Sequence, residues 1–350
     1  MKKMRKHVMA FTLMLVMMFA MTVMASAERV PVDSTTDEGT LSGMLDLYGM
    51  TQTDATKSSA TVSWPATSPV YYVYKGGVYQ GVTAETTFKV TGLIAGSLQE
   101  IEVIGYVDAS ADPNALYAQL LNELQTTGDT TMNVVAGYAV ATPGKPENVA
   151  SAKYSDTYNW FPSQNNSVTI GWTMNKNDQY YADGWKVEIK TVDGKKKLKT
   201  YNVAGSEYTQ GLYSKTFKLK AVNNTGFSVK VQGYVFMSNG AKKYGTWSGK
   251  KVVIPQAKVK TKKKTNSSMT VSWTKIKNAT KYEVYLCKNA DASNPKYKKV
   301  ATLGKNKTSY VVKNMKTYQK YGVWIKATVK YGKKTYKSAL SGYNTFWFTY

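Results

Sequence analysis

The stretch SSMTVSW at Ser267–Trp273 has two near-copies in the chain, SSATVSW at Ser58–Trp64 and NSVTIGW at Asn166–Trp172. In each copy, apolar residues alternate with polar ones, and the run ends in tryptophan. A period of two is typical of a β-strand with one buried face. We therefore expect three equivalent strands, each with its tryptophan in a core and its Thr and Ser side chains toward water.

The three tryptophans also mark a long-range repeat. Trp64, Trp172 and Trp273 are 108 and 101 residues apart, and an aromatic strand follows each of them. Within these following strands, Gly76-Gly77 and Asp193-Gly194 predict hairpin turns. Many short strands in units of roughly 100 residues predict tandem all-β sandwiches, each large enough for its own core.

Residues 256–350 carry the most complete spacing, Trp, then Tyr-x-Val, then Met six residues before Tyr-x-Val-x-Ile-x-Ala. The residues at these positions are Trp273, Tyr282, Val284, Met315, Tyr321, Val323, Ile325 and Ala327. This pattern resembles the fibronectin type III domain of exported bacterial proteins. The resemblance implies that the Tyr321 hydroxyl bonds back to the chain upstream. Gln99 and Phe227 take that place in the other copies, for which an immunoglobulin-like sandwich is the alternative.

The predicted fold class is all-β, with three tandem immunoglobulin-like or fibronectin type III β-sandwiches after a signal peptide and a short helix inserted in the first. Prolines around residues 143–146 and at Pro255 cannot continue a central strand, and they set the boundaries. The predicted ranges are a signal peptide at 1–27, a flexible segment at 28–44, and sandwiches at 45–143, 144–255 and 256–350.

The first 27 residues have the pattern of a secretory signal peptide. MKKMRK is positively charged, a long apolar run follows, and Ala25-Ser26-Ala27 supplies small residues for cleavage. We therefore expect an exported protein, extracellular or at the cell envelope, with no transmembrane span after cleavage. An uncleaved membrane anchor is the alternative.

The insertion covers residues 112–126 and breaks the repeat. Asp112 suits a helix N-cap and Pro113 the first helical position, so we expect a helix to about Gln125. Its leucines share one stripe: Leu116, Leu120 and Leu124. We expect this stripe to cover the end of its own sandwich, and a partner-binding helix is the alternative.

The composition argues against catalysis. After the predicted cleavage site the chain has no histidine and one cysteine, Cys287. The usual general base and the commonest zinc ligands are therefore missing. Glu100 and Glu102 lie two apart on a strand, but no sugar cleft or phosphate loop accompanies them. We expect solvated acids on a strand edge, and we predict no enzyme activity, no cofactor and no metal.

Lysine is distributed unevenly along the chain. Residues 28–143 hold 4 basic and 13 acidic residues, residues 144–255 hold 17 and 7, and residues 256–350 hold 22 and 2, giving −9, +10 and +20. Such a surface attracts polyanions. The candidate polyanion-binding residues lie in three blocks: Lys195, Lys196 and Lys197; Lys258, Lys260, Lys262, Lys263 and Lys264; and Lys333 and Lys334. Protection of strand edges and solubility is the alternative.

These features predict a non-catalytic binding or adhesion protein whose lysine-rich second and third domains contact an anionic cell-wall polymer or an acidic polysaccharide. A host or neighbouring-cell surface is a further candidate partner. Nucleic acid is disfavoured, because every basic residue after Arg29 is lysine and the chain has no base-reading motif.

Aromatic residues favour a second function, that of a carbohydrate-binding module. Tyr158, Trp160 and Phe161 are expected in a loop, where flat rings can stack on sugar faces. Trp324 lies between two inward-facing residues of a predicted strand and should therefore point outward. We favour packing of these rings between neighbouring domains, and stacking on a sugar is the alternative.

Overall fold

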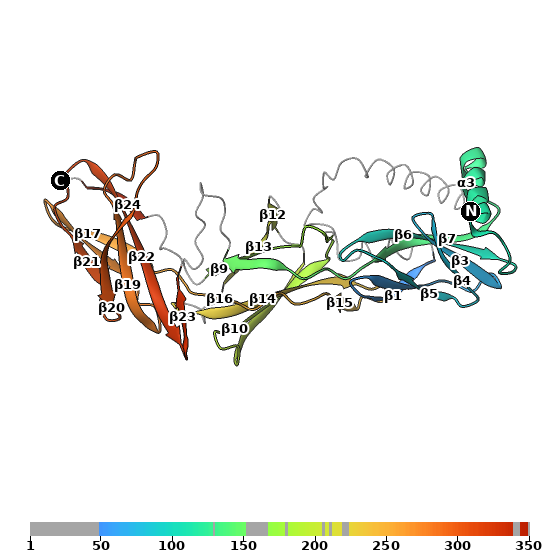
Figure 1. Cartoon of the computed structure of the whole chain (residues 1–350), viewed down its shortest axis with the longest axis horizontal. Coiled ribbons are helices and arrows are strands. Elements are labelled where there is room, and N and C mark those ends of the chain that lie inside the picture. The colour runs from blue at the N-terminus through green and yellow to red at the C-terminus, as the bar shows by residue number, and fades with distance from the viewer. Residues whose placement is uncertain are drawn as a thin grey trace. The chain divides into compact units, whose positions relative to one another are not determined.

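The computed structural model is built from β-strands and one α-helix in the described part of the chain (Figure 1). It describes residues 49–128, 130–151, 167–178, 181–204, 207–209, 212–218, 224–338 and 344–348. The predicted signal peptide and the segment at 28–44 lie outside these ranges. The described strands form six sheets, and the strands of every sheet fall inside one of the three predicted sandwich ranges. The prediction of tandem immunoglobulin-like β-sandwiches with one inserted helix is confirmed.

Contacts between Cα atoms divide the chain into two units, and two segments of the second predicted range belong with the first sandwich. These segments are residues 175–184 and 233–246. Within this unit the Gln52 N–H donates to Ser238 Oγ at 2.8 Å, and Lys243 pairs with Asp54 at 2.6 Å. The proline-containing joint at 143–146 therefore separates the sheets of the first and second sandwiches, but residues on either side of it still contact one another.

The first sandwich packs a three-stranded sheet, ordered β1-β2-β5, on a four-stranded sheet, ordered β4-β3-β6-β7. All neighbouring strands are antiparallel. The strands are β1 (Thr51–Ala55), β2 (Ser59–Ser63), β3 (Val70–Lys75), β4 (Val78–Thr83), β5 (Thr87–Thr91), β6 (Leu98–Tyr106) and β7 (Asn133–Val140). Val62 and Trp64 meet Val73 and Ile101 in the core, as the alternation of the first copy predicts.

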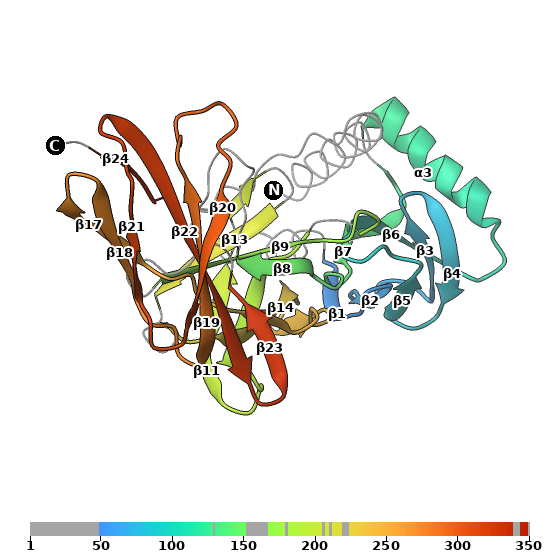
Figure 2. The same cartoon turned by 60° about the vertical axis from the view of Figure 1, so that its left-hand side comes forward.

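Helix α3 (Pro113–Thr127) covers the outer face of the four-stranded sheet (Figure 2). Asp112 caps it, accepting from the Asn114 N–H at 2.8 Å, and Gly128 ends it with a φ of 68°. The predicted leucine stripe is buried against residues of β3, β6 and β7: Tyr72, Tyr74, Ile104 and Ala136. The prediction that the helix covers its own sandwich is confirmed, although it covers a face and not the end.

The second sandwich packs a sheet ordered β12-β13-β9-β8 on a sheet ordered β11-β10-β14-β15, and β16 pairs with β14. The strands are β8 (Glu147–Ser151), β9 (Ser167–Thr173), β10 (Gly184–Thr191), β11 (Lys197–Ala204), β12 (Glu207–Thr209), β13 (Leu212–Lys218), β14 (Phe227–Phe236), β15 (Lys242–Tyr244) and β16 (Lys251–Val253). Trp172 and Trp185 are among its fully buried side chains.

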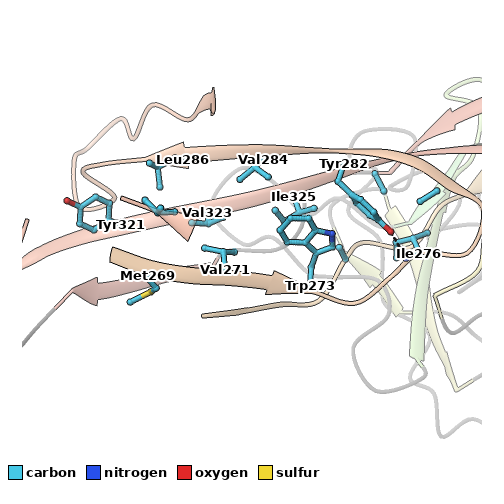
Figure 3. Close-up of a cluster of buried hydrophobic side chains, with 14 of the residues drawn as sticks. Met269, Val271, Trp273, Ile276, Tyr282, Val284, Leu286, Tyr321, Val323 and Ile325 are labelled. Atoms are coloured by element: carbon cyan, nitrogen blue, oxygen red, sulfur yellow. Dashed lines mark hydrogen bonds between the residues drawn. The ribbon is translucent and has the colours of Figure 1, made fainter. Parts of the chain in front are cut away.

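The third sandwich packs a smaller sheet, ordered β17-β18-β21, on a larger sheet, ordered β20-β19-β22-β23, and β24 also pairs with β22. The strands are β17 (Val259–Thr265), β18 (Ser268–Trp273), β19 (Ala279–Cys287), β20 (Lys298–Gly304), β21 (Ser309–Val312), β22 (Gln319–Tyr331), β23 (Lys334–Lys337) and β24 (Asn344–Phe348). Figure 3 shows the alternating apolar residues of β18, β19 and β22 facing one another in the core.

The tryptophan of each copy packs against an aromatic ring of the following strand at almost the same distance. The pairs are Trp64 with Tyr71 at 5.4 Å, Trp172 with Trp185 at 5.3 Å and Trp273 with Tyr282 at 5.5 Å between ring centroids. The three copies of the opening stretch are therefore equivalent strands, as predicted.

Buried tyrosines tie the strands to the chain before them. The Tyr321 hydroxyl accepts from the Lys316 N–H at 2.7 Å, which confirms the bond implied by the family resemblance. Tyr282 accepts in the same way from the Ile276 N–H at 2.9 Å (Figure 3), and Tyr71 accepts from two N–H groups upstream. The sequence did not predict the bonds of Tyr282 and Tyr71.

The predicted hairpin turns are present. Gly76 and Gly77, between β3 and β4, have φ angles of 51° and 76°, and Gly194, between β10 and β11, has a φ of 83°. Residues other than Gly, Asn and Asp seldom adopt these φ angles. The turn residues therefore fix the register of the strands that they join.

Candidate functional site

The lysines predicted as polyanion-binding residues lie in three separate places. Lys195 and Lys196 lie in the exposed turn before β11, Lys197 begins β11, Lys333 lies in the turn after β22 and Lys334 begins β23. Lys258 is half-buried before β17; Lys260, Lys262, Lys263 and Lys264 belong to β17, and the side chain of Lys263 is outside the description. The three blocks lie on three different sheets, those of β11, β17 and β23.

A denser group of charges lies on the outer face of the larger sheet of the third sandwich. Both acidic residues of range 256–350, Glu283 and Asp291, are found along this face. Glu283 lies on β19 between the buried residues Tyr282 and Val284, so its side chain points away from the core. Asp291 follows β19 and pairs with Lys320 of β22. Runs of lysine in the sequence do not point to this face.

Three lysines from different strands surround Glu283. Its Oε1 lies 3.7 Å from Lys281 Nζ and 4.0 Å from Lys299 Nζ, and its Oε2 accepts from the Tyr285 hydroxyl at 3.1 Å. Burial alone would raise the pKa of Glu283, but the bond from Tyr285 and the charges of Lys281, Lys299 and Lys337 hold that pKa below its usual range. Lys281 and Lys299 keep about half of their side-chain surface exposed, so their amines can still reach an anion in solvent.

A second pair of charges stands beside an exposed ring on the same face. Lys320 is the cross-strand partner of Trp347 in the β22–β24 ladder, and its Nζ lies 5.7 Å from the centroid of the indole ring. Asp291 Oδ1 is 2.7 Å from Lys320 Nζ. The side chain of Trp347 is 55% exposed, while its neighbour Phe348 is buried. A ring with a fixed cation beside it is typical of a binding surface for planar or polar ligands.

Trp324 points outward from β22, as predicted, but its ring is partly covered. Tyr297, from the segment between β19 and β20, stacks on Trp324 with ring centroids 3.4 Å apart and planes 5° apart. The Tyr297 ring occupies the space that a side chain at Gly322 would need. A sugar stacking on this face of Trp324 would therefore have to displace Tyr297. The other predicted stacking residues, Tyr158, Trp160 and Phe161, lie outside the described residues, so their role stays a prediction.

The carboxylates of the first sandwich are not solvated, and the prediction that they are is wrong. Glu102 is 1% exposed and accepts from the Tyr117 hydroxyl of α3 at 3.0 Å, while Glu100 is half-buried. Burial, together with the charge of Glu102, raises the pKa of Glu100 to about 7. Burial also raises the pKa of Glu102. The physical reason is helix α3, which covers the sheet face to which both side chains belong.

Two further observations concern chemistry and membranes. In the described part of the chain, no three His, Cys, Asp or Glu side chains gather closely enough to hold a metal ion. Cys287 is buried at the end of β19, with its Sγ 3.2 Å from the Asn289 carbonyl oxygen.

No helix within the described ranges has the length and apolar character that crossing a membrane requires.

Comparison with known proteins supports the predicted resemblance. The family model of the Fibronectin type III domain matches residues 254–342, which cover most of the third sandwich. The chain is therefore a tandem array of fibronectin type III-like β-sandwiches, of which the third matches the family itself. The fibronectin type III domain is typically a non-catalytic binding or scaffold module, and the match of the third sandwich therefore suggests a binding- or adhesion-type role.

Among solved structures, the FN1–FN3 domains of chicken CNTN1 are similar to this chain, with 14% sequence identity and a TM-score of 0.27. The match covers 86% of this chain and 98% of that one. At this TM-score it carries no argument about function. No curated protein matches the chain in sequence.

Proposed function

We propose that this chain is a secreted or cell-envelope-associated, non-catalytic binding protein whose lysine-rich second and third sandwiches contact an anionic surface polymer. The observation that carries the proposal is the charge of residues 256–350, where 22 lysines stand against 2 acids. A lysine near an anionic surface contributes about 1 kcal/mol, and salt screens that attraction over roughly 8 Å at physiological ionic strength. Several lysines acting together therefore give a strong but salt-dependent attraction.

Edge protection and solubility explain only part of this charge. The lysines of β17 lie on an edge strand, where they discourage pairing with another chain. Lys281 of β19 and Lys326 of β22 lie on central strands, which have no free edge to protect. A net charge of +20 also exceeds the roughly 2 to 8 that solubility asks of a small domain. The excess favours a binding role.

The direct test measures binding of the full chain to an immobilised anionic cell-wall polymer and to a neutral polymer as ionic strength rises. We expect tight binding to the anionic polymer at low salt and release as the salt approaches about 0.5 M, where screening is nearly complete. Retention in about 1 M salt, or equal binding to the neutral polymer, would contradict the proposal. Saturable, salt-independent binding to a neutral sugar would instead support the carbohydrate-binding alternative.

The place of the protein in the cell is tested separately. Cells that make the full chain are fractionated into cytoplasm, membrane, wall and medium, with and without a salt wash. We expect the chain in the wall fraction or the medium, and we expect the wash to move it from the former to the latter. Accumulation in the cytoplasm would contradict export without bearing on polymer binding.

A further inference from the structure

The third sandwich exposes aromatic rings at one end of its larger sheet. Trp347 of β24 is 55% exposed, because alternation along β24 buries Phe348 and turns Trp347 outward. Tyr318, which is 73% exposed, is tied to the same place by a bond from its N–H to the Phe348 carbonyl oxygen at 2.8 Å. Exposed tryptophan and tyrosine side chains in one place are typical of binding surfaces.

The charges beside Trp347 are held in position by the fold. Lys320 pairs with Trp347 in the strand register, and its carbonyl oxygen accepts from the Ala290 N–H at 3.0 Å. That backbone bond places the next residue, Asp291, where its carboxylate reaches Lys320 Nζ at 2.7 Å. The site therefore presents a flat ring, a cation and a carboxylate in a fixed arrangement.

The same alternation of rings and amines continues across the face. Farther along β22, Trp324 is the cross-strand neighbour of Tyr285 on β19, and Tyr285 is in turn the neighbour of Lys299 on β20. Tyr285 leads to the lysine cluster around Glu283. A linear ligand lying across these strands would meet aromatic and cationic groups in turn.

We propose that the outer face of the β20-β19-β22-β23 sheet, with β24, binds an acidic polysaccharide. Trp347 stacks on a sugar ring, and Lys320 and the lysines around Glu283 pair with the acid groups of the chain. This inference rests on the proposed function and names the ligand class. Aromatic rings alone would suit a neutral sugar, and lysines alone would suit any polyanion. Their combination suits a polymer that has both sugar rings and acid groups.

The two carboxylates favour the polysaccharide over a chain of phosphates. Glu283 and Asp291 can accept hydrogen bonds from sugar hydroxyl groups, which polyphosphate lacks, and they repel its closely spaced charges. The lysine amines act as point charges and lack the fork geometry by which arginine recognises phosphate in a bidentate manner. A polymer with spaced acids and many hydroxyl groups therefore fits this face better than polyphosphate.

The test uses the full chain and three soluble probes. Polygalacturonate carries rings and charge, its fully methyl-esterified form carries rings without charge, and polyphosphate carries charge without rings. We expect polygalacturonate to bind at least about tenfold more tightly than either of the others. Trp347→Ala should abolish the preference over polyphosphate, and Trp347→Phe, which keeps a ring, should retain most of it.

Matched lysine variants locate the site. Lys320→Gln removes one charge beside Trp347, and Lys313→Gln removes one charge at the exposed position directly after β21 of the smaller sheet. We expect the first to weaken polygalacturonate binding about fivefold or more and the second to change it less than twofold. Unchanged thermal melting of all variants shows that the fold is retained, which the exposure of Trp347 leads us to expect.

The outcomes separate the inference from the proposed function. If polyphosphate binds as tightly as polygalacturonate, or if Trp347→Ala binds polygalacturonate as the natural chain does, the inference falls while polyanion binding stands. Equal losses from Lys320→Gln and Lys313→Gln would likewise overturn the site. If neither anionic probe binds, or the esterified probe binds equally well, the inference and the proposed function both fall.

Discussion

The buried carboxylates of the first sandwich should make its stability fall as the pH rises from about 4.5 to about 7. Glu100 and Glu102 lie two residues apart on β6, on the face that α3 covers. The side chains that act on the pKa values of Glu100, Glu102 and Tyr117 are one another and Tyr74, and none of them is a cation. The neutral form of each carboxyl therefore suits the folded protein better than its charged form.

The size and sign of the effect follow from Glu100. Raising its pKa from 4.5 to about 7 corresponds to about 3 kcal/mol, at ~1.4 kcal/mol per pH unit. Below pH 4.5 the carboxyl is protonated in the folded and unfolded states alike, and no stability is lost. As the pH rises to about 7 the unfolded state releases its proton and the folded state keeps it, so stability falls. By pH 8.5 the loss is complete, and it amounts to at most about 3 kcal/mol, because solvent screens the partly exposed carboxyl.

Hydrogen exchange of the full chain, measured by mass spectrometry at pH 5 and pH 8.5, tests this locally. Protection factors for peptides from β6 and α3 correct for the intrinsic pH dependence of exchange and give the free energy of opening. We expect protection to fall by up to about 3 kcal/mol more in the natural chain than in Glu100→Gln, in which Glu102 still titrates. Glu85→Gln, at an exposed position of the same sandwich, should behave as the natural chain does. Parallel falls in the natural chain and Glu100→Gln would refute the reasoning.

Three further substitutions test the fold and the covered ring. Leu120→Ala should destabilise α3 and the sheet beneath it by about 2–5 kcal/mol, read as lost hydrogen-exchange protection, because Leu120 is completely buried. Tyr321→Phe leaves a backbone N–H without its acceptor and should cost about 1–3 kcal/mol in urea unfolding of the third sandwich; an unchanged midpoint would contradict the role of this hydroxyl. Gly322→Ala places a methyl group where the Tyr297 ring lies, so it should move that ring from Trp324 and change the tryptophan fluorescence with little change in melting. Fluorescence equal to that of the natural chain would contradict the stack.

Local pattern was enough to predict most of the fold. The alternation that ends in Trp64, Trp172 and Trp273 identified three equivalent strands, because a period of two admits no other regular structure. The turn glycines and the capped leucine helix were also read correctly, since each depends on residues that are close in sequence. Such patterns do not show which sheet face the helix covers. For this reason Glu100 and Glu102 were predicted to be solvated, although the helix covers them.

The candidate site was harder to predict because it is assembled by strand register. Runs of lysine are visible in the sequence, whereas Lys281, Lys299 and Lys337 come from three strands and act on one carboxylate, Glu283. A signal for Trp347 was present, since an inward Phe348 requires its neighbour to face outward. The covering of Trp324 by Tyr297 could not be read in the same way, because it depends on how the segment between β19 and β20 folds back.

The positions of Glu283 and Asp291 bear on how the positively charged third sandwich would select among anionic ligands. A surface with lysines alone attracts every polyanion and distinguishes little among them. In residues 256–350 both carboxylates are paired with lysines of one sheet face, and that face also carries the exposed indole ring. The two carboxylates weaken the attraction of this sheet face for an anionic ligand, so their placement does not increase affinity. They pair with Lys281 and Lys320 and repel closely spaced negative charges, and such a cost in attraction is what selection between anionic ligands requires.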